Sequence, residues 1–381
     1  MRIAMVHSSF AIRGGAERYV RDLSRDLVAR GHTVRVLHRG PGTGDPDDHL
    51  VRARLSARVP ALRKLFTHLG DLVDPTGLSV GDLVDFRPDV VHVHNWQGIG
   101  VLPVARLARR YPTCHTVHDY AICDPNNALA HIGRGRPVDR LLGLRSAWLA
   151  RQLRDVTLLW PAERTRDIVH AHAPQASRLT GRIVPLAVPV PEARWYPGRR
   201  DVFLYLGALA PHKGIGILLD AWRAVADETT ATLLIAGDGP GRDEVEAAAR
   251  GCPSIRYLGY LDEGGRVRAM RDAGWLVFPS QWPENFPLSC VEALVAGRPV
   301  ITSDVARPPM ASDASLVGFA DRAALVDALR RCAGISAERY RDMSASAAAD
   351  GRRLDWGAHV AEVVRTYEAL AATKVSEVGA A

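Results

Sequence analysis

The chain has 381 residues, of which 47% are hydrophobic and 24% charged, as is typical of a folded globular protein. This length exceeds what one ordinary hydrophobic core accommodates and predicts two domains. The net charge of +7 fits an anionic partner, such as a phosphorylated substrate, a membrane surface or nucleic acid. The sequence contains no recognisable nucleic-acid-binding module, and no apolar run approaches the roughly 18 residues of a membrane-spanning helix.

The first half of the chain alternates short apolar runs with helical patterns, which predicts a parallel sheet covered by helices. The segment 1–7 is typical of a first strand rather than of a signal peptide. The helix that follows is predicted from apolar side chains at helical spacing between Ala16 and Leu27, and Gly31 suits its end. Residues 41–48 are predicted to form a loop. The expected strands are residues 3–6, 33–38, 90–94, 113–117, 157–160 and 182–185.

A proline-rich segment, residues 185–197, separates this half from a second one with the same alternation. We therefore predict an α/β protein with two Rossmann-like, doubly wound domains, at residues 1–186 and 187–355. Residues 356–381 follow the second domain, with a final helix at 356–372 and a frayed tail after Lys374. The expected strands of the second domain are residues 202–207, 232–236, 255–258, 275–278 and 299–302, and its expected helices include 215–226 and 242–250.

The segment Pro279–Gly297 carries the most informative pattern, two glutamates seven residues apart. An apolar strand precedes Glu284, and a helix is predicted from Leu288, with Glu292 about one turn inside it. Open α/β sheets bind phosphorylated ligands where strand ends meet helix N-termini. Carboxylates accept hydrogen bonds from hydroxyls but do not favour phosphate, so the pair indicates a ligand with both groups, such as a nucleotide sugar. The alternative for an isolated pair is two solvated surface glutamates.

Two further strand ends carry candidate phosphate contacts. Gly14 and Gly15 lie between the first strand and its helix, where the backbone can approach an anion, although a plain loop is the alternative. Lys213 lies between a strand and a helix in the second domain and is one of three lysines in an arginine-rich chain. Its ammonium group suits a leaving diphosphate; the alternative is a surface lysine at a helix start.

Histidines follow two strands of the first domain, in the segments 91–96 and 113–119. A metal site is conceivable there but disfavoured, because the spacing fits no strong zinc pattern and no thiolate cluster accompanies it. Asp45-Pro46-Asp47 has an Asp-x-Asp form, but it lies in a polar loop without a preceding strand and is interpreted as loop composition. We therefore expect no metal and no cofactor.

In the order Gly14-Gly15, His118-Asp119-Tyr120, Lys213 and Glu284 to Glu292, these motifs resemble the family-4 retaining glycosyltransferases over nearly the whole chain. The resemblance implies the GT-B fold and a final helix that returns to the first domain. It also implies that the first domain binds the acceptor and the second the nucleotide sugar. The catalytic residues that it implies are His118, Lys213 and Glu284. The donor-binding residues that it implies are Gly14, Gly15, Asn285, Phe286, Leu288 and Glu292.

By this resemblance, Glu284 and His118 contact the donor sugar, Glu292 the ribose diol, and Lys213 the diphosphate. The chain departs from the family at Ala208, where many members carry an arginine that pairs with the lysine; His212 or another arginine could compensate. Pro287 replaces a glycine found in much of the family and has no N–H to donate, so the contacts to sugar hydroxyls should differ.

The predicted function is metal-independent glycosyl transfer from a nucleotide-diphosphate sugar to a small-molecule, glycan or lipid-linked acceptor, with retention at the anomeric carbon. Alternatives are a sugar-nucleotide epimerase, a phosphorylase and a non-catalytic nucleotide-sugar-binding protein. Five scattered cysteines indicate reduced thiols and a cytoplasmic protein. The arginines and leucines of residues 134–154 form a solvated helix face in the favoured interpretation, and a peripheral contact with the inner face of the membrane in the alternative.

Overall fold

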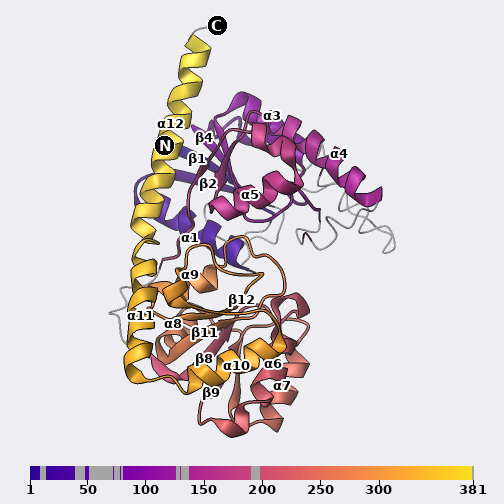
Figure 1. The fold of residues 1–381 in the computed structure, drawn as a ribbon. Coiled ribbons are helices and arrows are strands. Elements are labelled where there is room, and N and C mark those ends of the chain that lie inside the picture. Colours follow the sequence, from indigo (N-terminus) through magenta and orange to yellow (C-terminus); the bar gives the residue numbers. More distant parts are fainter. Residues whose placement is uncertain are drawn as a thin grey trace. The chain divides into compact units, whose positions relative to one another are not determined.

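The computed structural model describes residues 1–8, 14–38, 48–50, 72, 78, 80–125, 129, 137–189 and 198–379 (Figure 1). The chain divides into two compact units. Unit 1 comprises Met1–Pro185 together with Gly357–Ala381, and unit 2 comprises Leu186–Trp356. Each unit is built on a parallel sheet of its own, as the alternating strand and helix patterns predict.

Unit 1 contains a seven-stranded parallel sheet with the order β3-β2-β1-β4-β5-β6-β7 in the described part of the chain. Strand β1 pairs with β2 on one side and with β4 on the other, so the strand order reverses between β1 and β4. Such a switch point is where open α/β sheets bind ligands, at the carboxyl ends of the strands. The strands are β1 (Arg2–Val6), β2 (Thr33–His38), β3 (Asp48–Leu50), β4 (Val90–Val93), β5 (Thr113–Thr116), β6 (Thr157–Trp160) and β7 (Gly181–Ile183).

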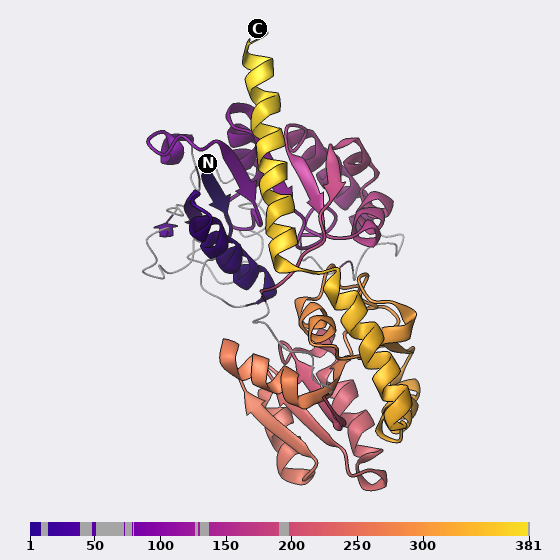
Figure 2. The same cartoon turned by 90° about the vertical axis from the view of Figure 1, so that its left-hand side faces the viewer.

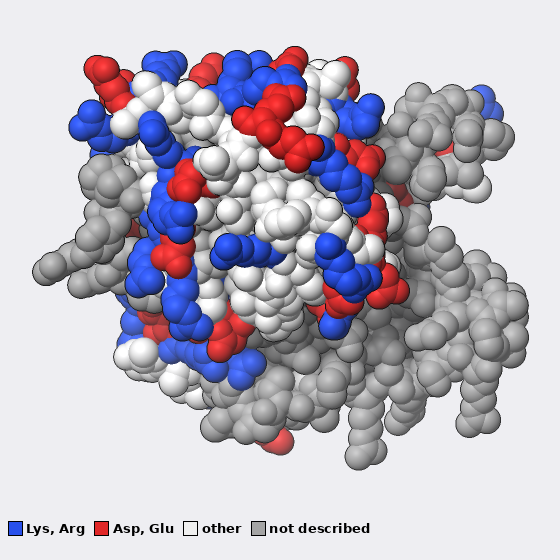
Figure 3. Space-filling model, turned by 90° about the horizontal axis from the view of Figure 1, so that it is seen from below, with Lys and Arg blue, Asp and Glu red and all other residues white. Residues whose placement is uncertain are grey.

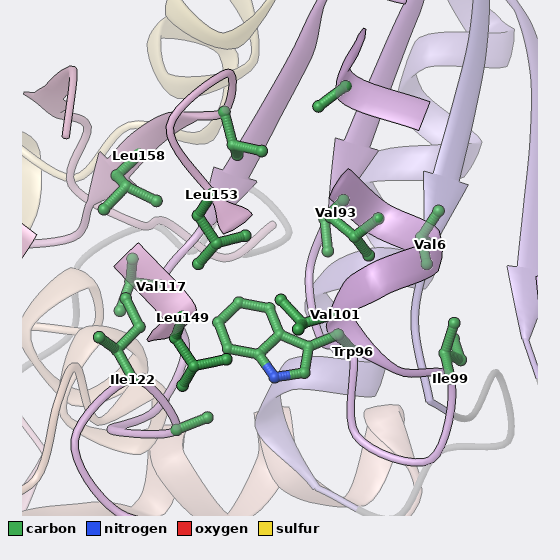
Figure 4. Close-up of a cluster of buried hydrophobic side chains, with 14 of the residues drawn as sticks. Val6, Val93, Trp96, Ile99, Val101, Val117, Ile122, Leu149, Leu153 and Leu158 are labelled. Carbon is green, nitrogen blue, oxygen red and sulfur yellow. The ribbon is translucent and has the colours of Figure 1, made fainter. Parts of the chain in front are cut away.

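The core of unit 1 is a cluster of buried aliphatic side chains around Trp96, whose ring lies among Val93, Val101 and Leu149 (Figure 4). Strands of a doubly wound sheet are buried on both faces, which is why β1, β4 and β5 are continuous apolar or histidine-containing runs. The helices of this unit are α1 (Gly15–Ala29), α3 (Val101–Arg110), α4 (Pro137–Gln152), α5 (Glu163–His172) and α12 (Trp356–Gly379), with short 3-10 turns at Val80–Leu83 and Pro174–Arg178.

Helix α12 is the last element of the chain, yet it belongs to unit 1 and lies beside α1 (Figure 2). Two buried hydrogen bonds hold it there. The Tyr19 hydroxyl of α1 lies 2.8 Å from His359 Nε2, and the Tyr367 hydroxyl lies 2.6 Å from His92 Nδ1 of β4. The helix continues to Gly379, beyond the expected end, because no glycine or proline interrupts residues 358–378. The helix therefore ends seven residues later than the expected end at residue 372.

Unit 2 contains a six-stranded parallel sheet with the order β10-β9-β8-β11-β12-β13. Its order reverses between β8 and β11, which pair directly. The strands are β8 (Arg199–Leu206), β9 (Thr232–Ala236), β10 (Ile255–Gly259), β11 (Ala273–Phe278), β12 (Val300–Ser303) and β13 (Leu316–Phe319). The helices are α6 (Ile215–Arg223), α7 (Arg242–Gly251), α8 (Glu263–Asp272), α9 (Leu288–Val295), α10 (Arg322–Ala333) and α11 (Ala337–Arg352), with 3-10 turns at Pro211–Lys213, Ala226–Glu228 and Asp313–Ser315.

Two strands were missed by the sequence patterns, and both are short. Strand β3 begins at Asp48, which was assigned to a loop, and pairs with β2 through Val36 and Asp48. Strand β13 has four residues, one of them Gly318, and pairs with β12 at the edge of its sheet. A short edge strand needs few apolar side chains, so the alternation that predicts strands is weak there.

Charged side chains are well mixed on the face of unit 2 that Figure 3 presents, where blue and red residues alternate around an uncharged area. Several of the charges in this unit form ion pairs, such as Arg242 with Glu246 on α7 and Arg330 with Glu228. Neither the positively charged nor the negatively charged side chains form a continuous patch on this face.

Candidate functional site

The carboxyl ends of β8 and β11 bring two loops of unit 2 together. Because these strands are parallel neighbours, the loop after β8, which carries Lys213, meets the loop after β11, which carries Glu284. The N–H of Gln281 donates to the His212 carbonyl over 2.8 Å. Gly214 has a φ of +75°, and a Cβ there would lie 1.9 Å from the Pro279 carbonyl oxygen. Only glycine allows this close approach of the two loops.

The carboxylate of Glu284 is held by three donors that all reach its Oε1 atom. The Lys213 ammonium group lies 2.6 Å away, the Ser280 hydroxyl 2.6 Å and the Trp282 indole N–H 3.0 Å. The Glu284 side chain is only 13% exposed, so it stays in this position with little competition from water. Because Oε1 is fully engaged, Oε2 is the oxygen that is left to accept hydrogen bonds from a ligand.

An aromatic pair flanks the ion pair of Lys213 and Glu284. The rings of His212 and Trp282 have centroids 3.9 Å apart, and the Lys213 ammonium group lies 5.5 Å from the Trp282 centroid. Burial, followed by the charge of Lys213, lowers the pKa of His212. His212 is therefore neutral at neutral pH and does not supply the second cation that Ala208 fails to provide.

Helix α9 begins at Leu288, as its apolar pattern predicts, and places Glu292 in its second turn. Asn285 and Phe286, in the turn before it, are both buried. Glu292 is nine-tenths buried, and its Oε1 lies 2.5 Å from Nη2 of Arg266, in the first turns of α8. Pro287 is the N-cap of α9, and its carbonyl accepts from the N–H groups of Cys290 and Val291, which leaves the N–H groups of Leu288 and Ser289 to face outward from the helix N-terminus.

In unit 1, Gly14 and Gly15 open helix α1, close to the end of β1. The first turn of α1 also carries Glu17, whose Oε1 lies 3.9 Å from Nε2 of the buried His7. Burial acts to raise the pKa of Glu17, but the interaction with His7 and the nearby backbone N–H groups outweigh it, and the pKa is lowered. The turn therefore already has a carboxylate that stabilises the helix N-terminus.

His118 lies just beyond β5 and contacts a row of histidines from neighbouring strands. Its Nε2 atom is 3.1 Å from His94 Nδ1, and its ring packs edge-on against Tyr19 of α1. Burial, with a contribution from nearby histidines, lowers the pKa values of His94 and His118 well below the usual range. Both rings are neutral at neutral pH, and Nδ1 of His118 is the nitrogen that His94 does not engage.

Comparison with known proteins assigns the chain to a family. Residues 14–164 match the model "Glycosyl transferase 4-like domain", and residues 200–334 match "Glycosyl transferases group 1". The chain belongs to the family-4 glycosyltransferases. It is therefore a nucleotide-sugar-dependent, retaining glycosyltransferase with the GT-B fold.

Relatives of this glycosyltransferase act on different substrates. Glycogen synthase of Mycobacterium tuberculosis is 29% identical over 339 residues, which cover 80% of this chain and 78% of the relative. Phosphatidyl-myo-inositol mannosyltransferase of the same organism is 27% identical over 388 residues, covering 97% of each chain. The structure of sucrose-phosphate synthase from Thermosynechococcus elongatus superposes with a TM-score of 0.74 at 19% identity, over 98% of this chain and 99% of the other.

The site residues predicted for this glycosyltransferase fall into two groups. Unit 2 holds Lys213, Glu284, Glu292, Asn285, Phe286 and Leu288 around the carboxyl end of β11. Unit 1 holds His118, beyond β5, and Gly14 and Gly15, at the start of α1. Asp45 and Asp47 lie outside the described residues. Within the described ranges, no group of three or more histidine, cysteine or acidic side chains could hold a metal ion.

Three residues that contact the predicted carboxylates were not predicted, namely Ser280, Trp282 and Arg266. Ser280 and Trp282 lie within four residues of Glu284, so the local sequence contained a usable signal. Arg266 lies 26 residues before Glu292 on a different helix, so no spacing rule connects the two.

Proposed function

We propose that unit 2 binds the nucleotide-sugar donor at the carboxyl ends of β8 and β11, and that Lys213 and Glu284 form the reactive end of that site. The observation that supports this most strongly is the Lys213–Glu284 pair, with its 2.6 Å separation. A cation for the diphosphate and a carboxylate for sugar hydroxyls lie side by side there. Glu292 takes the ribose diol, and Asn285, Phe286 and Leu288 form the turn between the two carboxylates.

The roles of these residues follow from where charge develops during glycosyl transfer. The bond between the anomeric carbon and the diphosphate lengthens, so the sugar gains oxocarbenium character and the diphosphate gains negative charge. Lys213 stabilises the leaving diphosphate, with the N–H groups of Leu288 and Ser289 at the start of α9 as further donors. These donors supply the positive charge without a metal ion.

Glu284 holds the sugar from unit 2. Glu284 Oε2 accepts a hydroxyl hydrogen bond, because Oε1 is engaged by three donors. In unit 1, His118 is neutral because its pKa is lowered well below the usual range, so as a ligand contact it acts as a hydrogen-bonding group rather than as a cation. The protein then contributes mainly positioning and electrostatic stabilisation.

We further propose that unit 1 binds the acceptor and that the acceptor is presented at an anionic membrane surface. Helix α4 supports this proposal, because Leu141 and Leu144 on it are 66% and 70% exposed. Arg140 and Arg151 are exposed on the same side of the helix, whereas Leu149 faces the core. A helix with basic and apolar side chains on its outer face suits the interface of an anionic bilayer.

We also propose a cytoplasmic location, because the cysteines are reduced thiols. All five cysteines are free in the structure. Among the described helices, none is long and apolar enough to cross a membrane.

The donor proposal is tested by incubating the purified protein with a panel of UDP-, GDP- and ADP-sugars, with and without candidate acceptors. We expect one donor to be consumed in an acceptor-dependent reaction, and Glu284→Ala to abolish the transfer. Conversion of the donor to an epimer without acceptor would identify an epimerase instead. Donor binding without turnover under all conditions would identify a non-catalytic binding protein.

The membrane proposal is tested by sedimentation with vesicles of neutral phosphatidylcholine, with or without phosphatidylglycerol. We expect salt-sensitive binding to the anionic vesicles only, reduced by the double substitution L141S/L144S. The matched control is Leu258→Ser, an exposed leucine of unit 2. Equal binding by all three proteins, or no binding, would contradict the proposal.

A further inference from the structure

Arg266 is a cation of unit 2 that the family motifs do not identify. It lies in the first turns of α8, which packs on β8 and β11, the two strands that carry the proposed donor site. The helix starts after β10 and runs back to β11, so its N-terminal turns lie at the carboxyl edge of the parallel sheet. Arg266 therefore belongs to the same edge as Lys213 and Glu284.

The guanidinium group of Arg266 contacts one of the two motif carboxylates. Its Nη2 donates to Glu292 Oε1 over 2.5 Å, and the two side chains are 25% and 10% exposed. An arginine holds a carboxylate with directional, charge-assisted hydrogen bonds, whereas a lysine acts as a point charge. The contact therefore restricts the direction in which Glu292 presents its other lone pairs.

A second feature concerns another nitrogen of the Arg266 guanidinium group. The Nε atom of Arg266 is buried and has no hydrogen-bond partner in the described part of the chain. A buried donor without a partner is unfavourable for folding, and such violations are concentrated at functional sites.

Ala208 carries no charge, and His212 is neutral. The site has Lys213 paired with Glu284 and Arg266 paired with Glu292, so each carboxylate has a cation of its own.

We propose that Arg266 is a positioning residue of the donor site, which orients the Glu292 carboxylate to accept hydrogen bonds from the ribose hydroxyls of the nucleotide. This inference rests on the proposed donor site. It predicts that Arg266 acts on recognition of the ribose diol, through Glu292, and not on recognition of the base.

The test compares ribonucleotides with their 2′-deoxy counterparts. Binding of UDP, GDP, 2′-deoxy-UDP and 2′-deoxy-GDP is measured by titration calorimetry for the wild type, Arg266→Gln, Glu292→Gln and the double variant. We expect the wild type to prefer the ribonucleotide by about tenfold, as for a hydrogen bond to a charged group. In Arg266→Gln and Glu292→Gln this preference should fall to near unity, with the affinity for the deoxynucleotide nearly unchanged.

The double variant should show no further loss of the preference for the ribonucleotide, because the two residues act through one contact. Arg268→Gln, at an exposed arginine two residues along the same helix, should keep the wild-type preference. Arg266→Lys keeps the charge but not the directional contact, so this variant should retain only part of the preference for the ribonucleotide.

If the preference for the ribonucleotide persists in Arg266→Gln but is lost in Glu292→Gln, Arg266 is not a positioning residue. A preference unchanged in both variants would overturn the ribose contact of Glu292 as well. Failure of the wild type to bind either UDP or GDP would instead contradict the proposed donor site. Circular dichroism and thermal unfolding of each variant separate these outcomes from a loss of folding.

Discussion

The Lys213 ammonium group lies 2.6 Å from Glu284 Oε1, although 71 residues separate the two in the chain. The pairing follows from topology, since β8 and β11 are parallel neighbours and their carboxyl-end loops meet at the switch point of the sheet. It also means that Lys213 is neutralised by a neighbour before any donor arrives. In the proposed donor site, a bound diphosphate shares this lysine with Glu284, so we expect the two residues to respond to the ligand together.

Substituting Lys213 and substituting Glu284 should therefore lower the activity through different kinetic parameters. We expect Lys213→Ala to lower kcat by about 100-fold or more, because the cation at the leaving group is lost. Glu284→Gln keeps the size of the side chain but loses the charge, and should lower kcat/KM with less effect on the affinity for the nucleoside diphosphate. Steady-state kinetics and calorimetry with the accepted nucleotide check both expectations. Lys213→Ala with wild-type kcat would exclude a role for the lysine in stabilising the leaving group.

Trp282 should matter through its N–H group rather than through its bulk. Its indole donates to Glu284 Oε1 over 3.0 Å while its ring packs on His212. We expect Trp282→Phe, which keeps an aromatic ring but removes the donor, to lower kcat/KM by about tenfold to 100-fold, the effect of one hydrogen bond to a charged group. Trp148→Phe in unit 1 is a matched control with no contact to Glu284. An equal loss in both variants would show that the effect is general destabilisation.

Much of the fold and part of the site could be predicted from the sequence because the information is local. The strand before Glu284 and the helix from Leu288 follow from apolar spacing, and they place Glu292 in the second turn of α9. The contact of Arg266 with Glu292 could not be predicted, since it depends on how α8 and α9 pack around β11. Of the three donors to Glu284 Oε1, Ser280 and Trp282 lie in the same loop as Glu284, whereas Lys213 depends on the meeting of two loops.

A second cation can be introduced at position 208. Ala208 is exposed, and its backbone carbonyl accepts from the Tyr205 hydroxyl over 2.6 Å and from the Ala210 N–H over 2.9 Å. We expect Ala208→Arg to lower the KM for donor by about threefold to tenfold through a further charge-assisted contact to the diphosphate. Ala208→Gln provides similar length without charge and should leave the KM unchanged. An unchanged KM in the arginine variant would contradict a pair of cations on the diphosphate.

Gly214 should be required for the meeting of the two loops. Its φ of +75° is left-handed, and a Cβ would overlap the Pro279 carbonyl oxygen at 1.9 Å. We expect Gly214→Ala to lower the free energy of unfolding by more than the about 1–2 kcal/mol that a left-handed alanine costs by itself. Gly259→Ala isolates that conformational cost, because Gly259 has a φ of +69° and open space around it. Denaturant unfolding curves that show equal losses for the two variants would exclude a steric contribution at Gly214.

The buried histidines of unit 1 should make its stability depend on pH. Burial lowers the pKa of His92 to about 3 and the pKa values of His115 and His359 to about 4. Above pH 6.5 these side chains are neutral in both the folded and the unfolded chain, so they add no pH dependence. Below pH 6.5 these histidines become protonated in the unfolded chain but stay neutral in the folded chain. The free energy of unfolding therefore falls as the pH falls towards the pKa values of the folded chain.

Each such histidine should add at most about 1.4 kcal/mol per pH unit to this loss. We expect the denaturation midpoint to be flat from pH 8 to 7 and to decline from pH 6.5 to 5, with a smaller decline in His92→Gln. Glutamine does not titrate and can still form hydrogen bonds where His92 meets Tyr367 and Thr116. His172→Gln, at an exposed histidine at the end of α5, should decline as the wild type does. A His92→Gln curve parallel to that of the wild type would show that protonation of this histidine does not limit the stability of unit 1 in acid.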